Sequence, residues 1–225
     1  FHYIKRVMRQ EVGNNILLFN GSDGEWLAKI IAFGKTTCSM VLVQQTRSQH
    51  DTLDLSLIFS PIKKKRLDFM IEKATELGVS RLIPVFTERT DTRRINLDRL
   101  SKTAIEAAEQ CGRISVPIIE DALPLEKMLN NWSADRMIYL MDETSHARTV
   151  RELAFEKYSM DEFLKGIAIL VGPEGGFTFS EFELMKKFKF LYSVSLGSQI
   201  LRSETAAVAA LSCFQILSGS LYKSS

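Results

Sequence analysis

The segment GIAILVGPEGGF, residues 166–177, decides the expected fold of this chain. Its first half is a short apolar run, which is typical of a buried strand. Its second half, GPEGG at residues 172–176, holds three glycines and a proline around one glutamate, which is more than a tight turn requires. Because glycine has no side chain, a ligand can reach the main chain of such a loop directly. The segment therefore predicts a strand that ends in a ligand-binding loop.

A second segment of this kind lies near the C-terminus. The run SVSL, residues 193–196, leads into GSQILRSETAAVAALS, residues 197–212. Gly197 follows the strand, Ser203 can cap the final helix, and Glu204 suits the positive N-terminus of that helix. A simple turn explains Gly197 easily, but it explains the glycine-rich loop less well. We expect both loops to leave adjacent strands at their carboxyl ends and to form one site.

A helix is expected directly after the glycine-rich loop. Ser180 and Glu183 have the spacing of a capping box, and Phe179 and Leu184 are placed as its hydrophobic staple. The spacing predicts that Ser180 is the N-cap of this helix.

Strand and helix patterns alternate along the chain from Leu55 onward. Helices are expected over residues 67–77 and 97–111, each followed by a glycine that would end it. Apolar strands are expected at residues 55–59, 81–86, 137–141, 167–171 and 192–196. This alternation is typical of an α/β domain with a mostly parallel sheet and helices on both faces.

The first 46 residues have a different pattern. Apolar or β-branched runs at residues 15–19, 26–33 and 38–45 are separated by turn clusters, which is typical of the strands of a small barrel. The polar stretch at residues 46–54 follows as a linker. We therefore predict a β-barrel domain over residues 1–50 and an α/β domain over residues 51–225.

Composition excludes several classes of protein. The 225 residues carry a net charge of +2, and 45% of them are hydrophobic, as in ordinary globular proteins. The three cysteines form no C-x-x-C pair and the three histidines are scattered, which argues against a disulfide framework and a metal site. No run is long enough to span a membrane, and the first residues lack the apolar core of a signal peptide. A cytoplasmic protein is expected.

The charge of the glycine-rich loop limits its ligand. The chain has no G-x-x-x-x-G-K-[ST] loop and no G-x-G-x-x-G after its first strand, which disfavours a nucleotide hydrolase or kinase. The only charge within GPEGG is the negative charge of Glu174. Such a loop suits a neutral or cationic ligand, and S-adenosylmethionine, whose sulfonium is positive, fits.

Several blocks of the sequence resemble a known family. VGPEGGF with SEFE, followed by SLGSQILRSETAAVAAL, resembles the cofactor signature of the SPOUT-class methyltransferases. Within that class the chain is most similar to the RsmE-type family, which methylates ring nitrogen 3 of a uridine in 16S ribosomal RNA. HYIKRVMR at residues 2–9, the block at residues 63–90 and AIEAAEQCGRISVP at residues 104–117 resemble further parts of the family. The resemblance therefore covers nearly the whole chain in order.

The resemblance implies a fold and partners. It implies a SPOUT-type α/β sheet with a deep C-terminal trefoil knot, preceded by a small PUA-like β-barrel that helps to bind RNA. It also implies a homodimer that acts on 16S ribosomal RNA or the 30S subunit, with S-adenosylmethionine held in the knot. The cofactor-binding residues that it implies are Leu140, Met141, Gly172, Pro173, Glu174, Gly175, Gly176, Leu196, Gly197, Ser198, Ile200 and Leu201.

Two residues beside the second loop are candidates for catalysis. The imino nitrogen of uridine is a poor nucleophile until its proton leaves, and a guanidinium would stabilise the resulting anion. Arg202 is our candidate for that role, and the alternative is that it pairs with Glu204 or with a phosphate. Glu204 and Glu174 are the nearest carboxylates in the sequence that could take the proton, although either could instead cap a helix or bind amides.

Basic residues elsewhere are candidates for RNA contacts. A basic run alone is usually a solvated surface. In the light of the family blocks, we expect phosphate contacts from Arg6, Arg9, Arg89 and Arg113. The run at residues 63–66 opens a helix, where cations oppose the macrodipole, and this favours a functional reason for it.

Other functions remain open from the sequence. One alternative keeps the fold but transfers the methyl group to a ribose 2′-hydroxyl or a guanine. Another is a non-catalytic RNA-binding protein of the same fold, against which the intact GPEGG and ILRSET blocks speak.

Overall fold

The chain divides into two compact units, which we describe separately. The computed structural model describes residues 1–50, 53–143, 147–150, 152 and 166–217. The smaller unit comprises Phe1–Asp51 and Gly112–Val116, and the larger one comprises Thr52–Cys111 and Pro117–Ser225. The smaller unit thus includes a short segment from the middle of the chain.

The smaller unit is built on an antiparallel sheet with the strand order β1-β2-β3. A short π-helix precedes it, and the elements are η1 (Tyr3–Val7), β1 (Asn15–Phe19), β2 (Glu25–Phe33) and β3 (Cys38–Arg47). The three strands were predicted to within two residues, because turn residues bound each apolar run. Ile16, Ala28 and Ile30 form the buried core of this unit. Closure of the sheet into a barrel stays a prediction.

An ion pair joins the start of β2 to the end of β3. Glu25 and Arg47 lie opposite each other in the register, and the Arg47 guanidinium donates to the Glu25 carboxylate. The hydroxyl of Thr46 donates to Glu25 Oε1 at 2.8 Å. The hydrogen bond from Arg47, supported by the one from Thr46, lowers the pKa of Glu25 below its ordinary value of 4.5. The carboxylate of Glu25 is therefore favoured in the folded unit.

This lowered pKa predicts a pH-dependent contribution to stability. A carboxyl whose pKa is lower in the folded than in the unfolded state stabilises the fold above its unfolded pKa, and this stabilisation is lost as the pH falls through the folded value. Glu25→Gln should therefore destabilise the smaller unit at pH 7, and the difference from the parent should shrink below the ordinary value of 4.5. Urea unfolding followed by the fluorescence of Trp26 at several pH values measures this, with Trp132→Phe in both proteins to isolate the signal. A difference that is constant with pH would contradict the assignment.

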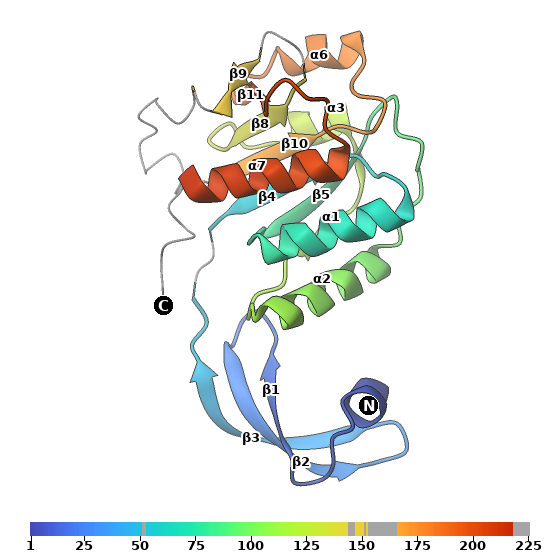
Figure 1. Cartoon of the computed structure of the whole chain (residues 1–225), viewed down its shortest axis with the longest axis vertical. Helices are drawn as coiled ribbons and strands as arrows, with labels where there is room; N and C mark the ends of the chain where they lie inside the picture. Colours follow the sequence, from blue (N-terminus) through green and yellow to red (C-terminus); the bar gives the residue numbers. More distant parts are fainter. Residues whose placement is uncertain (51–52, 144–146, 151, 153–165, 218–225) are drawn as a thin grey trace. The chain divides into compact units, whose positions relative to one another are not determined.

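The larger unit contains a sheet whose strand pairs are all parallel among the described residues. Its order is β6-β5-β4-β10-β8-β11-β9, and β7 pairs with β5. Figure 1 shows the strands from β5 to β9 in this order. The strands are β4 (Leu55–Phe59), β5 (Arg81–Phe86), β6 (Ile118–Ile119), β7 (Leu123–Pro124), β8 (Met137–Met141), β9 (Arg148–Thr149), β10 (Ile167–Val171) and β11 (Leu191–Ser195). The predicted parallel α/β sheet is confirmed. The expectation that β10 and β11 are adjacent was wrong, because β8 lies between them.

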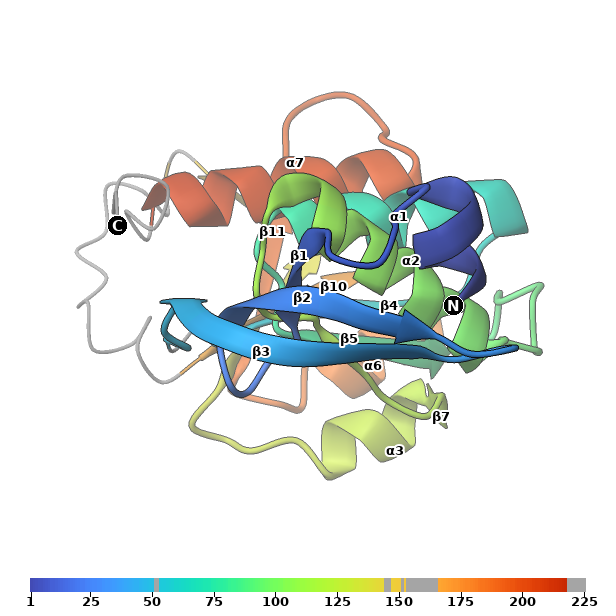
Figure 2. The ribbon, with the colours of Figure 1, turned by 90° about the horizontal axis from the view of Figure 1, so that it is seen from below.

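Helices cover both faces of this sheet, as predicted (Figure 2). One face carries α1, which packs against α2 and α7, while α7 also packs on β10. Residues of α3 and α6 join the buried cluster on the other face, together with Ile138, Leu140 and Leu170. The helices are α1 (Lys64–Glu76), α2 (Leu97–Cys111), α3 (Leu125–Asn130), α6 (Phe179–Met185) and α7 (Ser203–Leu217). None of the helices in the described ranges is long and apolar enough to cross a membrane.

The side chains of β8 alternate between the two faces. Leu140 lies in the cluster beneath α3 and α6, whereas Tyr139 faces α7, where its ring centroid lies 4.5 Å from that of Phe214. This alternation places Met141, the last residue of β8, on the same side of the sheet as α7.

The start of α6 differs from the prediction. Its N-cap is Thr178 rather than Ser180, and Glu181 completes the capping box by accepting from the Thr178 amide at 2.8 Å. Glu181 is buried and also accepts from the Glu88 amide at 2.8 Å. Phe179 is 80% exposed, so the predicted staple does not form. The extra partner for Glu181 explains why the chain uses the earlier of two overlapping Ser/Thr-x-x-Glu spacings.

Candidate active site

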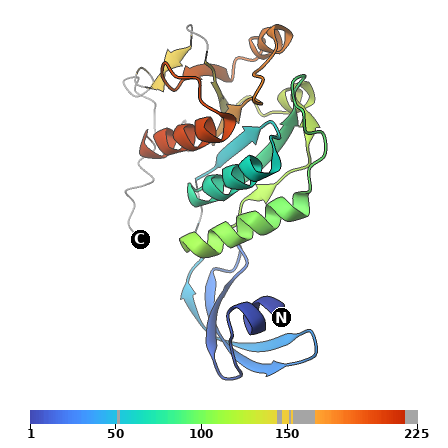
Figure 3. The same ribbon diagram turned by 45° about the vertical axis from the view of Figure 1, so that its right-hand side comes forward.

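The glycine-rich loop contacts the start of α7, the helix that follows the second loop. The hydroxyl of Ser203 donates to the carbonyl of Gly172, which joins the first turn of α7 to the glycine-rich loop. Ser203 is thus the first residue of α7, and its hydroxyl binds this loop rather than capping the helix as predicted. Both loops lie at the carboxyl edge of the sheet, where the end of β8 stands between them (Figure 3).

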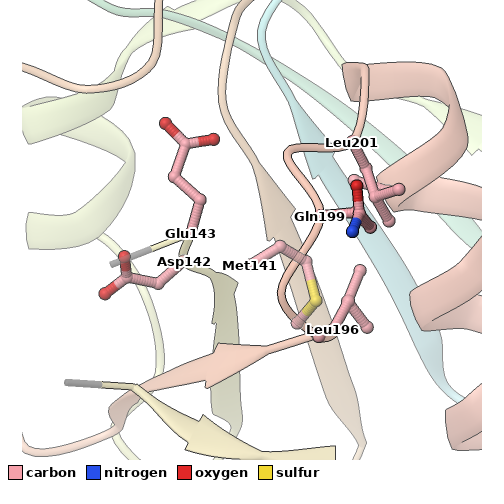
Figure 4. Close-up of a pocket in the computed structure, with 8 residues that line it drawn as sticks. Met141, Asp142, Glu143, Leu196, Gln199 and Leu201 are labelled. Carbon is pink, nitrogen blue, oxygen red and sulfur yellow. The ribbon is translucent and has the colours of Figure 1, made fainter. Parts of the chain in front are cut away.

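A pocket opens at this edge of the sheet. It spans about 320 Å³, part of which is open to solvent, and is lined by Met141, Asp142, Glu143, Leu196, Gly197, Gln199, Leu201 and Ala206. Figure 4 shows the side chains of Met141 and Leu196 near one another, with Asp142 and Glu143 on one side and Gln199 and Leu201 on the other. The pocket therefore combines apolar walls, bare main chain at Gly197 and two carboxylates. These groups suit a ligand that has an apolar ring and a positive charge.

Four of the predicted cofactor-binding residues line this pocket. They are Met141, Leu196, Gly197 and Leu201. Ser198 and Ile200 are exposed outside its lining, and Ile200 is 82% exposed. Leu140 is buried on the opposite face of the sheet, because successive strand residues point to opposite faces.

The glycine-rich loop borders the pocket without lining it. The amide of Gly176 donates to the carbonyl of Pro173 at 2.9 Å, so the loop is a turn with Glu174 and Gly175 at its tip. A Cβ on Gly176 would lie 3.5 Å from Glu143 Oε1, which puts the end of the loop beside the pocket wall. A Cβ on Gly172 would lie 2.7 Å from the ring of Phe177. The glycine at position 172 is thus explained by packing, and the one at 176 by its φ of 67°, which residues with a side chain rarely adopt.

Two arginines from distant parts of the chain hold the glycine-rich loop. Arg89 Nη1 donates to the carbonyl of Gly175 at 2.8 Å, and Arg66 Nη1 lies 2.6 Å from Glu174 Oε1. Arg89 was predicted to contact RNA, and in the structure its guanidinium is hydrogen-bonded to this loop. One main-chain carbonyl and one side chain of the loop are therefore bound by arginines that lie far away in the sequence.

The two predicted catalytic residues lie next to the pocket but do not line it. Arg202 is exposed and forms no ion pair with the described residues, and it follows the lining residue Leu201. Glu204 is buried, and its Oε1 lies 3.6 Å from Arg66 Nε. Its Oε2 has no hydrogen-bond partner within the described ranges. Glu204 pairs with Arg66 and not with Arg202. The ion pair between Arg202 and Glu204, which was one alternative from the sequence, therefore does not form.

The other predicted RNA contacts lie in the smaller unit. Arg6 belongs to η1, and both it and Arg9 are exposed. Arg9 has a φ of 54°, which is uncommon for a residue other than glycine. Arg113 is partly buried, and its Nη2 donates to Ser115 Oγ at 3.1 Å.

Sequence reasoning missed four residues of the pocket. Asp142 and Glu143 follow the apolar run of β8 directly, so the rule that parallel sheets bind ligands at their carboxyl ends could have found them. Gln199 and Ala206 carry no such signal. No group of three or more histidine, cysteine, aspartate or glutamate side chains in the described part of the chain is arranged to hold a metal ion.

Comparison with known proteins agrees with this geometry. Residues 49–215 match the family described as RNA methyltransferase domain, and residues 1–43 match the RNA methyltransferase PUA domain. The ribosomal RNA small subunit methyltransferase E of Rickettsia conorii is 38% identical over 96% of this chain and 86% of its own length. A crystal structure of the protein of that name from Neisseria gonorrhoeae, bound to S-adenosyl methionine, is similar with a TM-score of 0.83 and 28% identity, covering 96% of this chain and 88% of that one. A methyltransferase of Legionella pneumophila in complex with the same cofactor is also 28% identical, with a TM-score of 0.81 over 96% of this chain and 88% of that one.

Proposed function

The chain belongs to the RNA methyltransferase family, among relatives named ribosomal RNA small subunit methyltransferase E, and on this premise we propose how it acts. It is an S-adenosylmethionine-dependent ribosomal RNA methyltransferase that modifies ring nitrogen 3 of a uridine in 16S ribosomal RNA. The observation that carries this proposal is the contact between the glycine-rich loop and the first turn of α7, beside a pocket with apolar walls and two carboxylates.

The pocket fits the methyl donor. Met141, Leu196 and Leu201 would hold the adenine ring, and Gly197 leaves main chain open for its polar edge. The negative charge of Asp142 and Glu143 faces a cationic ligand. The glycine-rich loop, residues 172–176, borders the pocket at Gly176, beside Glu143. When bound, S-adenosylmethionine supplies an activated methyl group on a positively charged sulfur.

Arg202 acts on the nucleophile. Loss of the proton from the uridine imino nitrogen leaves a negative charge spread over this nitrogen and the two carbonyl oxygens beside it. The guanidinium of Arg202, exposed beside the pocket and unpaired among the described residues, stabilises that charge and so lowers the pKa of the imino group. Glu174 and Glu204, the two carboxylates considered as acceptors of this proton, both form ion pairs with Arg66. Above neutral pH a fraction of the imino group is already ionised, and the reaction then needs no dedicated base.

The fold and assembly complete the proposal. The chain leaves β11, passes the carboxyl end of β8 and reaches α7, which packs on β10 and contacts Gly172. We propose that this passage is the trefoil knot, that residues 1–50 form a PUA-like barrel that binds RNA, and that the enzyme acts as a homodimer. Light scattering measures the assembly, and a monomeric mass at micromolar concentration would contradict the dimer.

RNA binding is expected to depend steeply on salt. Arg6, Arg9 and Arg113 of the smaller unit supply cations for phosphate contacts, and each contact releases counterions. If the enzyme contacts ~6–10 phosphates, its affinity for 16S ribosomal RNA should fall by ~10³ to 10⁵ between about 50 and 200 mM salt. Arg9→Gln should lower the slope of log affinity against log salt by about one. Filter binding or fluorescence anisotropy measures both quantities, and a flat salt response would contradict a phosphate-binding surface.

One experiment tests the reaction itself. Deproteinised 16S ribosomal RNA and 30S particles from cells that lack the enzyme are incubated with it and S-adenosylmethionine, and the nucleosides are identified by mass spectrometry. We expect 3-methyluridine, and the comparison of the two substrates shows whether the assembled subunit is required. A 2′-O-methyl nucleoside or a methylguanosine would move the enzyme to the alternative specificity, and cofactor binding without any product would favour a non-catalytic RNA-binding protein.

A further inference from the structure

We propose that Arg66 is a positioning residue of the cofactor pocket, where it holds the glycine-rich loop and the first turn of α7 in a fixed relation to each other. The inference rests on the proposed function and extends it to a residue outside the pocket lining. Arg66 belongs to the basic run at residues 63–66, for which the sequence indicates a functional reason without saying which.

Arg66 joins the glycine-rich loop to the first turn of α7 through different atoms of one guanidinium. Its Nη1 lies 2.6 Å from Glu174 Oε1 at the tip of the glycine-rich loop. Its Nε lies 3.6 Å from Glu204 Oε1 in the first turn of α7. A planar guanidinium can serve two carboxylates at once, whereas a lysine ammonium is a point charge on a flexible stem. The geometry therefore favours arginine at this position.

Electrostatics at the two helix ends explain why the bridge forms. Arg66 lies in the first turn of α1, which has no acidic residue and no side-chain cap, so its charge opposes the helix dipole. The carboxylates of Glu174 and Glu204 offset this cost. Glu204 is only 9% exposed, and its Oε2 has no hydrogen-bond partner within the described ranges, so Arg66 is the countercharge that the structure provides for it. Removing Arg66 would leave a buried carboxylate uncompensated, which is strongly unfavourable.

The position of Glu204 links this bridge to the pocket. Glu204 lies between Leu201 and Ala206, which both line the pocket, and it follows Ser203, which binds the carbonyl of Gly172. A shift of the first turn of α7 would therefore move the pocket wall and the glycine-rich loop together. Small displacements of groups that orient a reacting molecule can cost up to about 100-fold in rate.

The neighbouring lysine provides a matched control. Lys65 is exposed, whereas Arg66 is partly buried, and both belong to the same basic run. Arg66→Met and Lys65→Met remove one positive charge each, but only the first removes the bridge. A purely electrostatic contribution to RNA binding would affect both variants alike.

The test compares cofactor and RNA affinities. Calorimetry with S-adenosylmethionine should give an affinity roughly 10- to 100-fold lower for Arg66→Met than for the parent, while Lys65→Met keeps the affinity of the parent. RNA affinity should differ little between the two variants. Arg66→Lys should fall between Arg66→Met and the parent, because it keeps one ion pair. Equal cofactor affinity for Arg66→Met and the parent would overturn the proposal.

A second variant separates positioning from folding. Glu174→Gln removes one arm of the bridge on a half-exposed side chain, so the fold is retained, and it should weaken cofactor binding less than Arg66→Met does. Adding Glu174→Gln to Arg66→Met should cause no further loss, because the two residues act through one contact. If Arg66→Met fails to fold, unchanged cofactor affinity of Glu174→Gln overturns the proposal. If the parent itself binds no S-adenosylmethionine, the proposed function fails and not the role of Arg66 alone.

Discussion

Arg202→Ala is expected to lower kcat by about 10² to 10³-fold, the range found when a donor to a developing anion is removed. Arg202 is exposed beside the pocket and has no ion pair among the described residues, so its removal leaves no buried carboxylate behind. The fold and the affinity for S-adenosylmethionine should be unchanged. Single-turnover methylation of 30S particles, with the cofactor saturating, measures the effect.

The pH dependence of this variant identifies the mechanism. If Arg202 lowers the pKa of the uridine imino group, this group should ionise at a higher pH in Arg202→Ala. The rate of the variant should therefore keep rising to a higher pH than that of the parent enzyme. Arg202→Lys should recover part of the rate, since it restores the charge. A variant with near-normal kcat and unchanged RNA affinity would refute the role, and a loss confined to RNA affinity would assign Arg202 to a phosphate instead.

Gly197→Val is expected to lower the affinity for S-adenosylmethionine by about 100-fold or more. Gly197 lines the pocket and has a φ of 126°, in a region that residues with a side chain rarely adopt. A β-branched residue there costs about 1–3 kcal/mol of backbone strain, and its side chain occupies space next to the ligand. Calorimetry with the cofactor measures the loss.

A second glycine provides the control for strain alone. Gly13 in the smaller unit has a φ of 95°, and a Cβ there, as at Gly197, would meet no atom within 4 Å. Gly13→Val should lower the stability of its unit and leave cofactor affinity unchanged. If Gly197→Val binds the cofactor like the parent, the loop at residues 196–201 is not part of the site.

Local sequence determined most elements but not their order in the sheet. The strands at residues 55–59 and 81–86 and the helix at 97–111 were predicted with their observed bounds, because turn residues or glycine limit each apolar pattern. The place of β8 between β10 and β11 depends on the crossover connections, which leave no periodic signal. The same holds for the partners of Arg66, which lie more than a hundred residues away along the chain.

The errors near the site have local causes. TFSEFE, residues 178–183, contains two overlapping capping-box spacings, and the contact of Glu181 with the amide of Glu88 favours the first. Leu140 was predicted to line the site together with Met141, but a strand directs successive residues to opposite faces, and only Met141 faces the pocket. The glycine-rich loop was expected to lie beside the segment that follows β11, and Ser203 at the start of α7 binds Gly172, whereas the formation of one ligand site by both loops stays a prediction.

Methyl transfer by this chain requires the methyl donor to occupy the space beside these two loops. A crystal structure of the protein with S-adenosylmethionine tests this most directly. We predict that the adenine ring lies against Leu196, Gly197 and Leu201, and that the cationic part lies on the side of Asp142 and Glu143. A cofactor bound elsewhere on the chain, or a crystal soaked at saturating concentration in which this pocket holds only water, would contradict it.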